Sequence, residues 1–152
     1  MAYEPPDPNW RTRVEREFAA QGFMNTLRAE LETIEPGRVT VAVAHDTGLS
    51  QQNGYLHGGV VGALLDNASG FAAMTLLPVD NIVLTVEYKA NFLRPAEGDR
   101  FLSTGEVVKA GRTLMVCEAK VVAAARPEAR IATALATMIS LEDGETAARL
   151  RG

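Results

Sequence analysis

The sequence contains a single cysteine, Cys117, and only two histidines, His45 and His57. One cysteine cannot form a disulfide within the chain, and so few thiol and imidazole groups do not make the clustered ligand pattern of a transition-metal site. The apolar neighbours of Cys117 predict a buried, unreactive thiol. The scarcity of cysteine and histidine predicts a protein of a reducing compartment, the cytoplasm, with no catalytic metal.

The sequence also lacks an uninterrupted apolar run long enough to span a membrane. Residues 59–77 approach the roughly 20 residues required, but Asp66 and Asn67 lie near their centre, where a charge is costly. Residues 1–16 carry prolines and charges where a secretory signal needs an apolar core. We therefore predict a buried helix over residues 59–77, no membrane association and no export.

Positive charge is in deficit, because 15 Lys and Arg stand against 19 Asp and Glu, a net charge of −4. That balance argues against a general nucleic-acid-binding surface. Aromatic residues make up only 6% of the 152 residues, but hydrophobic residues make up 47%. This composition predicts one globular domain over residues 1–152, with a flexible leader at residues 1–9 and a flexible tail at residues 142–152.

Hydrophobic periodicity predicts helices and strands that are segregated along the chain. Residues 10–31 have helical spacing, in one helix or two, and residues 59–77 form an apolar helix that ends at Pro78. Five stretches alternate as strands do, at residues 38–46, 81–93, 100–109, 113–124 and 130–141. In the second of these, alternation places Val86 and Tyr88 on one face and Thr85 and Glu87 on the other. The order predicts an α+β fold, an antiparallel sheet wrapped around the apolar helix, with a second copy of the chain covering the exposed sheet edge.

Three segments carry a more specific pattern. Residues 51–73 read QQNGYLHGGVVGALLDNASGFAA, in which an acid follows nine residues after the His of HGG. Residues 85–96, TVEYKANFLRPA, and residues 107–121, VVKAGRTLMVCEAKV, follow in order. Together they resemble hotdog-fold acyl-CoA thioesterases of the phenylacetate-pathway type, within the hydroxybenzoyl-CoA thioesterase superfamily. The resemblance implies a hotdog fold, hydrolysis of acyl-CoA to a free acid and CoA without a cofactor, and a homodimer that pairs again into a tetramer.

The residues of the first segment also suit thioester chemistry. Gly58 and Gly59 open a helix, where unpaired backbone N–H groups and the helix dipole favour negative charge, as on the oxygen of a tetrahedral intermediate. Positions 59, 62 or 63, 66 and 70 fall at helical spacings, so Asp66 lies on a stripe of small residues. A positioned carboxylate there can act as a general base on water or as a direct nucleophile.

Gly58 and Asp66 cannot act on one carbonyl carbon from the same helix. They are eight residues apart in the sequence, which corresponds to about 12 Å at 1.5 Å per residue. If both groups are used, Asp66 must face Gly58 of a partner chain that runs antiparallel. The prediction is then a dimer with two active sites related by a two-fold axis, an arrangement that the resemblance also implies.

The resemblance implies a role for each matching residue. Asp66 takes the place of the catalytic carboxylate, and the Gly58 N–H polarises the thioester carbonyl. His57 supports the loop or the substrate, and Thr85 matches a hydroxyl that orients the nucleophilic water.

One position departs from the phenylacetate-type pattern. Six residues before the His, that pattern carries Asn, whereas this chain has Gln51, which is similar to what hydroxybenzoyl-CoA thioesterases carry. Asn53 is the rival candidate for the same role. The departure leaves the subfamily open, and with it the choice between an aryl and a medium-chain acyl group.

The phosphates of CoA require cations in or beside turns. The sequence offers three candidates, Arg94 beside Pro95 and the turn residues Lys109 and Arg112. The acyl group is expected against the small and apolar side chains of the helix stripe and of the facing strand of the partner.

The same residues also admit plainer interpretations. Asp66 can be a partnered acid at a helix contact, His57 an anchor between loop and helix, and Gly58 a turn residue. Two other functions compete with hydrolysis: a non-catalytic acyl-CoA binding or sensing module, which would not require Asp66, and an enoyl-CoA hydratase or dehydratase, which needs an acid and a His acting together. A purely structural interaction role is the remaining alternative.

Overall fold

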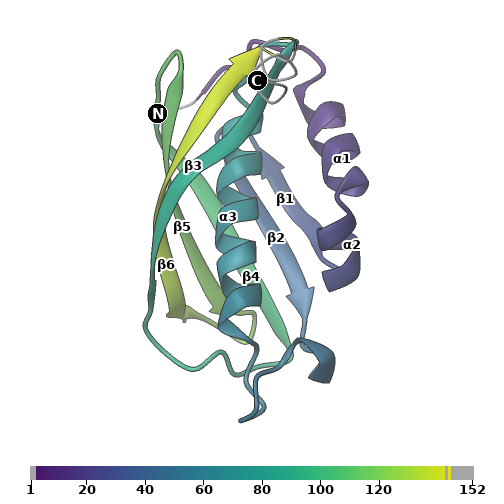
Figure 1. The fold of residues 1–152 in the computed structure, drawn as a ribbon, viewed down its shortest axis with the longest axis vertical. Helices are drawn as coiled ribbons and strands as arrows, with labels where there is room; N and C mark the ends of the chain where they lie inside the picture. Colours follow the sequence, from purple (N-terminus) through teal and green to yellow (C-terminus); the bar gives the residue numbers. More distant parts are fainter. Residues whose placement is uncertain (1–2, 143, 145–152) are drawn as a thin grey trace.

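The computed structural model describes residues 3–142 and 144, and it shows a six-stranded antiparallel sheet curved around one long helix (Figure 1). The elements in chain order are α1 (Trp10–Ala20), α2 (Gly22–Leu27), β1 (Glu30–Glu35), β2 (Arg38–Ala44), the short 3-10 helix η1 (Thr47–Leu49), α3 (Gly58–Met74), β3 (Asn81–Phe92), β4 (Arg100–Ala110), β5 (Leu114–Ala123) and β6 (Arg126–Glu142). The predicted α+β architecture, an antiparallel sheet wrapped around a long helix, is confirmed.

The strands lie in the order β1-β2-β4-β5-β6-β3. Hairpins join β4, β5 and β6, as the sequence predicts. Among the residues that the structure describes, β3 pairs only with β6, from Asn81 opposite Glu142 to Phe92 opposite Ala132. After β3 the chain crosses the end of the sheet to reach β4 (Figure 1). β3 is therefore an edge strand, and it lies along α3.

Small side chains on β4 allow α3 to approach the middle of the sheet. A Cβ atom at Gly105 would come within 2.4 Å of the backbone of Ala68 in α3, so only glycine fits without a shift. Two residues earlier, the Ser103 hydroxyl donates a hydrogen bond of 2.9 Å to the Leu64 carbonyl oxygen. β4 thereby fixes the height of α3 over the sheet, and with it the position of Asp66.

The main helix ends earlier than predicted. The prediction extended it to Leu77, before Pro78, but α3 ends at Met74. The Thr75 hydroxyl donates to the Ala72 carbonyl oxygen at 2.7 Å and accepts the Gly37 N–H at 2.7 Å. A side chain that binds backbone groups competes with helix continuation. One of the groups that Thr75 binds belongs to Gly37, 38 residues earlier, so the local sequence does not show where the helix ends.

The prediction for residues 10–31 was correct in part. Two helices form, but Leu31 belongs to β1, a strand that the prediction omitted. Arg28 has φ 53°, the left-handed conformation that ends α2. β1 is six residues long and mostly exposed, so its alternation is too weak to separate it from the helical pattern before it.

The predicted alternation along β3 is wrong at its centre. The register with β6 shifts between Thr85 and Glu87, which makes Val86 an extra residue in a β-bulge. Thr85 and Tyr88 consequently both face α3, instead of lying on opposite faces of the strand.

The leader makes specific contacts, although the sequence predicts it to be flexible. The Tyr3 hydroxyl donates to the Val107 carbonyl oxygen at 3.1 Å, and the buried Asp7 lies 3.4 Å from the Arg13 guanidinium. Residues 143 and 145–152 of the predicted flexible tail lie outside the described residues. In the part of the chain that is described, no helix is both long and apolar enough to cross a membrane.

Candidate functional site

One face of α3 is left uncovered by the sheet. The positions of α3 that are not fully buried are Gly58, Gly59, Ala63, Asp66, Gly70 and Met74. From Gly59 onward these positions recur every three or four residues, so they form one stripe along the helix. We call this set the open stripe. Asp66 is its only ionisable residue, and the predicted stripe of small residues coincides with the open face.

The Asp66 carboxylate is held by a hydroxyl from the edge strand. Thr85 donates a hydrogen bond from Oγ1 to Asp66 Oδ1 at 2.7 Å. The bulge in β3 places Tyr88 on the same side of the strand as Thr85, so both face α3. The bond fixes the carboxylate and leaves Oδ2 with no hydrogen-bond partner among the described residues, so it is available to bind water or to attack a carbonyl carbon.

The start of α3 provides a free backbone donor. His57 is the N-cap residue, and its Nδ1 accepts the Gly59 N–H at 2.8 Å. The ring therefore carries its proton on Nε2 and anchors the loop to the helix. The N–H groups of Val60 and Val61 bind the His57 carbonyl oxygen. Within the described chain, the Gly58 N–H is left without an acceptor, as a role in polarising a carbonyl requires.

The loop before α3 holds the other predicted polar residues. Gln51 Oε1 accepts the backbone N–H of Asn53, so that part of the Gln51 amide is used within the loop. His45, predicted to be a surface residue at a strand end, lies 3.0 Å from the Ser50 hydroxyl and 3.1 Å from the Gly54 carbonyl oxygen, and so ties β2 to this loop. The choice between Gln51 and Asn53 for the substrate-binding amide stays a prediction.

Two aromatic side chains from β3, which were not predicted as site residues, lie against α3 beside its glycines. The Tyr88 hydroxyl oxygen lies 3.1 Å from the position that a Cβ atom of Gly62 would take, and a ring carbon of Phe92 lies 3.5 Å from the corresponding position at Gly58. Thr85 thus lies beside Asp66, Tyr88 beside Gly62 and Phe92 beside Gly58, one helical turn apart along α3. Simple alternation would place Thr85 on the opposite face of β3 from Tyr88 and Phe92. The bulge at Val86 brings all three side chains to the face that lies against α3.

The candidate cations for CoA do not gather at one place within a chain. Arg94 follows β3, whereas Lys109 is the second-last residue of β4 and Arg112 lies in the turn after it, at the opposite end of the sheet. A hollow of about 200 Å³ instead brings Arg94 together with Arg126 and Tyr55. Neither Arg126 nor Tyr55 was predicted: the sequence places Arg126 in a turn, whereas β6 begins there, and Tyr55 lies in the loop before α3.

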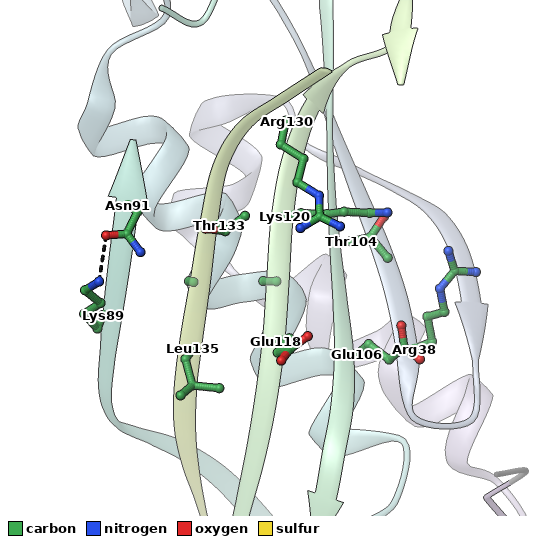
Figure 2. Close-up of a pocket in the computed structure, with 12 residues that line it drawn as sticks. Arg38, Lys89, Asn91, Thr104, Glu106, Glu118, Lys120, Arg130, Thr133 and Leu135 are labelled. Carbon is green, nitrogen blue, oxygen red and sulfur yellow. Dashed lines mark hydrogen bonds between the residues drawn. The ribbon is translucent and has the colours of Figure 1, made fainter. Parts of the chain in front are cut away.

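A separate hollow of about 510 Å³ lies on the other face of the sheet (Figure 2). Ser103 and Gly105 face α3, so the alternate β4 residues Thr104 and Glu106, which line this hollow, face away from it. The hollow is therefore separated from Asp66 by the sheet. In the described residues, no three His, Cys, Asp or Glu side chains are grouped as metal ligands.

Comparison with known proteins bears directly on this geometry. Residues 53–129 match the profile of a family described as the thioesterase superfamily. The chain belongs to the thioesterase superfamily. The matched range contains Gly58, Asp66, Thr85, Tyr88 and Phe92. Membership identifies the protein as a thioester hydrolase.

Individual members of the thioesterase superfamily support the same assignment. A thioesterase family protein from Silicibacter pomeroyi has 46% sequence identity and a TM-score of 0.84, over 88% of this chain and 98% of that one. A 1,4-dihydroxy-2-naphthoyl-CoA hydrolase from Listeria monocytogenes is 30% identical over 100 residues, 66% of this chain and 81% of that protein. The E. coli PaaI protein of the phenylacetic acid degradation operon has a TM-score of 0.79 at 16% identity, over 88% of this chain and 94% of that one. At that identity it shares the fold alone.

Proposed function

We propose that the protein hydrolyses an aryl or medium-chain acyl-CoA to the free acid and CoA, with Asp66 as the reacting carboxylate. The observation that carries the proposal is the Thr85–Asp66 hydrogen bond on the open stripe, which holds a carboxylate where a substrate can reach it. Thr85 positions Asp66 through its hydroxyl and leaves the second carboxylate oxygen for chemistry.

The proposed reaction proceeds in two stages. The Asp66 carboxylate removes a proton from water while the water oxygen bonds to the thioester carbonyl carbon, and the carbonyl oxygen gains negative charge that the Gly58 N–H of the partner stabilises. The C–S bond then breaks, and the CoA thiolate takes the proton from Asp66. Direct attack by Asp66 would instead form a mixed anhydride, and ¹⁸O appearing in Asp66 after a single turnover in labelled water would identify that route.

A two-fold dimer supplies both reacting groups to one site. β3 is an edge strand with exposed apolar residues, among them Leu84, Val86 and Phe92, and such an edge requires a cover. Antiparallel pairing of two β3 strands would cover it and place Asp66 of one protomer opposite Gly58 of its partner. The two-fold axis then passes near Gly62, halfway between them, where the Tyr88 hydroxyl lies.

The CoA moiety would leave the site at the start of α3. The Phe92 ring lies 3.5 Å from the position that a Cβ atom of Gly58 would take, and two residues later Arg94 lines the hollow that it shares with Arg126 and Tyr55. Two guanidinium groups and a phenol suit phosphate oxygens. Antiparallel pairing also brings the opposite end of the partner, with its Lys109 and Arg112, toward this side.

The identity of the acyl group is a further part of the proposal. The Listeria relative acts on 1,4-dihydroxy-2-naphthoyl-CoA, and this supports an aryl substrate here. Membership in the phenylacetate-pathway type stays a proposal, because the likeness to the PaaI protein concerns the fold.

The experiment that tests the proposal is thiol release from aryl, short, medium and long acyl-CoA esters by the natural protein and by Asp66→Asn. We expect turnover that falls by about 10²-fold or more in the variant, since a positioned acid or base contributes roughly 10² to 10⁴. Equal rates in the two proteins would remove Asp66 from the mechanism. Binding of CoA esters without thiol release by the natural protein would favour the non-catalytic module instead.

A further inference from the structure

Two hollows lie along the open stripe, on the side where α2 approaches α3. The first measures about 370 Å³ and is lined by Ala63 and Asp66 of α3 together with residues of α2. The second measures about 390 Å³ and is lined by Gly59 and Val60, at the start of α3, again with residues of α2. Gly59 and Asp66 are seven residues apart, which is about 10 Å along a helix at 1.5 Å per residue. The two hollows therefore follow one side of α3 from the proposed reacting carboxylate to the helix start.

A single aromatic side chain stands where the two hollows meet. Among the described residues, Phe23 of α2 is the only one that lines both hollows. Its neighbour Met24 and the later Leu27 are buried and join α2 to the core, whereas Phe23 is 58% exposed. The Phe23 ring therefore contributes little to the core and acts as a partition between the hollows.

A hydrogen bond between α3 and the start of α2 holds this partition in place. Asn67, next to Asp66 in α3, donates from Nδ2 to Oε1 of Gln21, the N-cap residue of α2, at 2.6 Å. At its other end α2 is fixed by the buried Leu27, which also lines the second hollow. Phe23 lies between these two fixed points, so its ring keeps its position along α3.

We propose that Phe23 limits the length of the straight-chain acyl groups that the site accepts. The inference rests on the proposed hydrolase function and adds an upper limit on chain length to it. A thioester carbon held at Asp66 has the first hollow for its acyl group, and the volume of that hollow is at the lower end of small-molecule sites. A longer chain has to pass Phe23 into the second hollow, beside the Gly58 N–H that serves the other site of the proposed dimer. The ring thus keeps the acyl groups of the two sites apart.

The test compares chain lengths on matched proteins. We would measure kcat/KM for the butanoyl, hexanoyl, octanoyl, decanoyl and dodecanoyl esters of CoA, with the natural protein and with Phe23→Ala. In the natural protein kcat/KM should rise to a medium length and then fall. In Phe23→Ala the rise should continue by about fourfold for each further methylene group that is buried, so the ratio of dodecanoyl-CoA to hexanoyl-CoA should increase by about tenfold or more. Because each ratio comes from a single preparation, partial loss of folded enzyme does not change it.

Two control variants separate the partition from a general loss of apolar surface. Phe23→Tyr keeps the ring and should keep the length profile of the natural protein. Val79→Ala shortens another exposed apolar side chain, one that lines neither hollow, and should also keep the profile. Three results would overturn the inference: an unchanged profile in Phe23→Ala, an equal shift in either control, or hydrolysis of aryl esters with no straight-chain ester hydrolysed. Each leaves the proposed hydrolysis standing, whereas thiol release from none of the esters in this panel or in the wider acyl-CoA panel would contradict both.

Discussion

At Gly58, the backbone N–H can be removed without disturbing the helix. Gly58 is the first residue of α3, a position where proline is favoured, and the preceding His57 has φ −61° and ψ 137°, which proline tolerates in its neighbour. Gly58→Pro should therefore fold and dimerise normally but lose about 10² to 10³ in kcat, the effect of one oxyanion donor. Gly58→Ala keeps the N–H and should retain far more activity, since its Cβ makes only ordinary contact with Phe92. Similar kcat values for the two variants would exclude the N–H from the mechanism.

Folding changes the pH range in which the Cys117 thiol loses its proton. Burial raises the pKa of its thiol from 9.0 to about 12. The folded protein thus keeps a proton that the unfolded chain releases, so stability is unaffected below about pH 9 and falls as the pH rises from 9 toward 12. At pH 8 the thiol should resist a thiol-specific reagent until guanidinium unfolds the chain, as colorimetric titration would show. Rapid labelling of the folded protein would contradict this burial.

Arg126 provides a test of where CoA binds. If its guanidinium holds phosphate, Arg126→Ala should raise KM for an acyl-CoA by roughly tenfold, the loss of one charge-assisted hydrogen bond. KM for the same acyl group on pantetheine, which lacks the nucleotide phosphates, should not change. Arg38→Ala, on the other face of the sheet, serves as the control. A parallel rise in KM for both thioesters would instead indicate a structural effect at the loop.

At the scale of elements, the contact between α3 and β4 positions Asp66. Because a Cβ atom at Gly105 would meet the α3 backbone at Ala68, Gly105→Ala should lower the free energy of unfolding by about 1 to 3 kcal/mol, as overpacking does. Urea denaturation at fixed protein concentration measures the change. In Gly70→Ala the new methyl group meets nothing within 4 Å, so that variant should be as stable as the natural protein or more stable. Equal stability of Gly105→Ala would show that α3 can shift.

The elements that the sequence predicted well are those whose pattern is local. β2 and β4 to β6 carry long alternating runs, and α3 begins at the predicted HGG because a polar loop and two glycines mark it. The errors arise from contacts between distant segments. Thr75 ends α3 by binding the N–H of Gly37, and the bulge at Val86 depends on pairing with β6.

In the candidate site, too, some residues could be predicted from local motifs and others only from tertiary contacts. Asp66 and Thr85 were predicted as separate candidates from their motifs, and the structure brings them to 2.7 Å. Tyr88 was not predicted to lie beside α3, because the bulge that places it on the same side of β3 as Thr85 depends on the pairing with β6. Residues that match a motif can be found in the sequence, whereas a residue defined by its tertiary neighbours cannot.

At the scale of the whole molecule, the proposed dimer predicts that two inactive variants restore each other. In a dimer of one Asp66→Asn chain and one Gly58→Pro chain, one site receives both substitutions and the other receives neither. Random exchange makes half of the dimers mixed, each with one intact site of two, so mixing equal amounts should recover about a quarter of the natural activity per chain. Sedimentation would first establish that both variants are dimers. If each site lay within one chain, every site in the mixture would carry one substitution, and mixing would recover nothing.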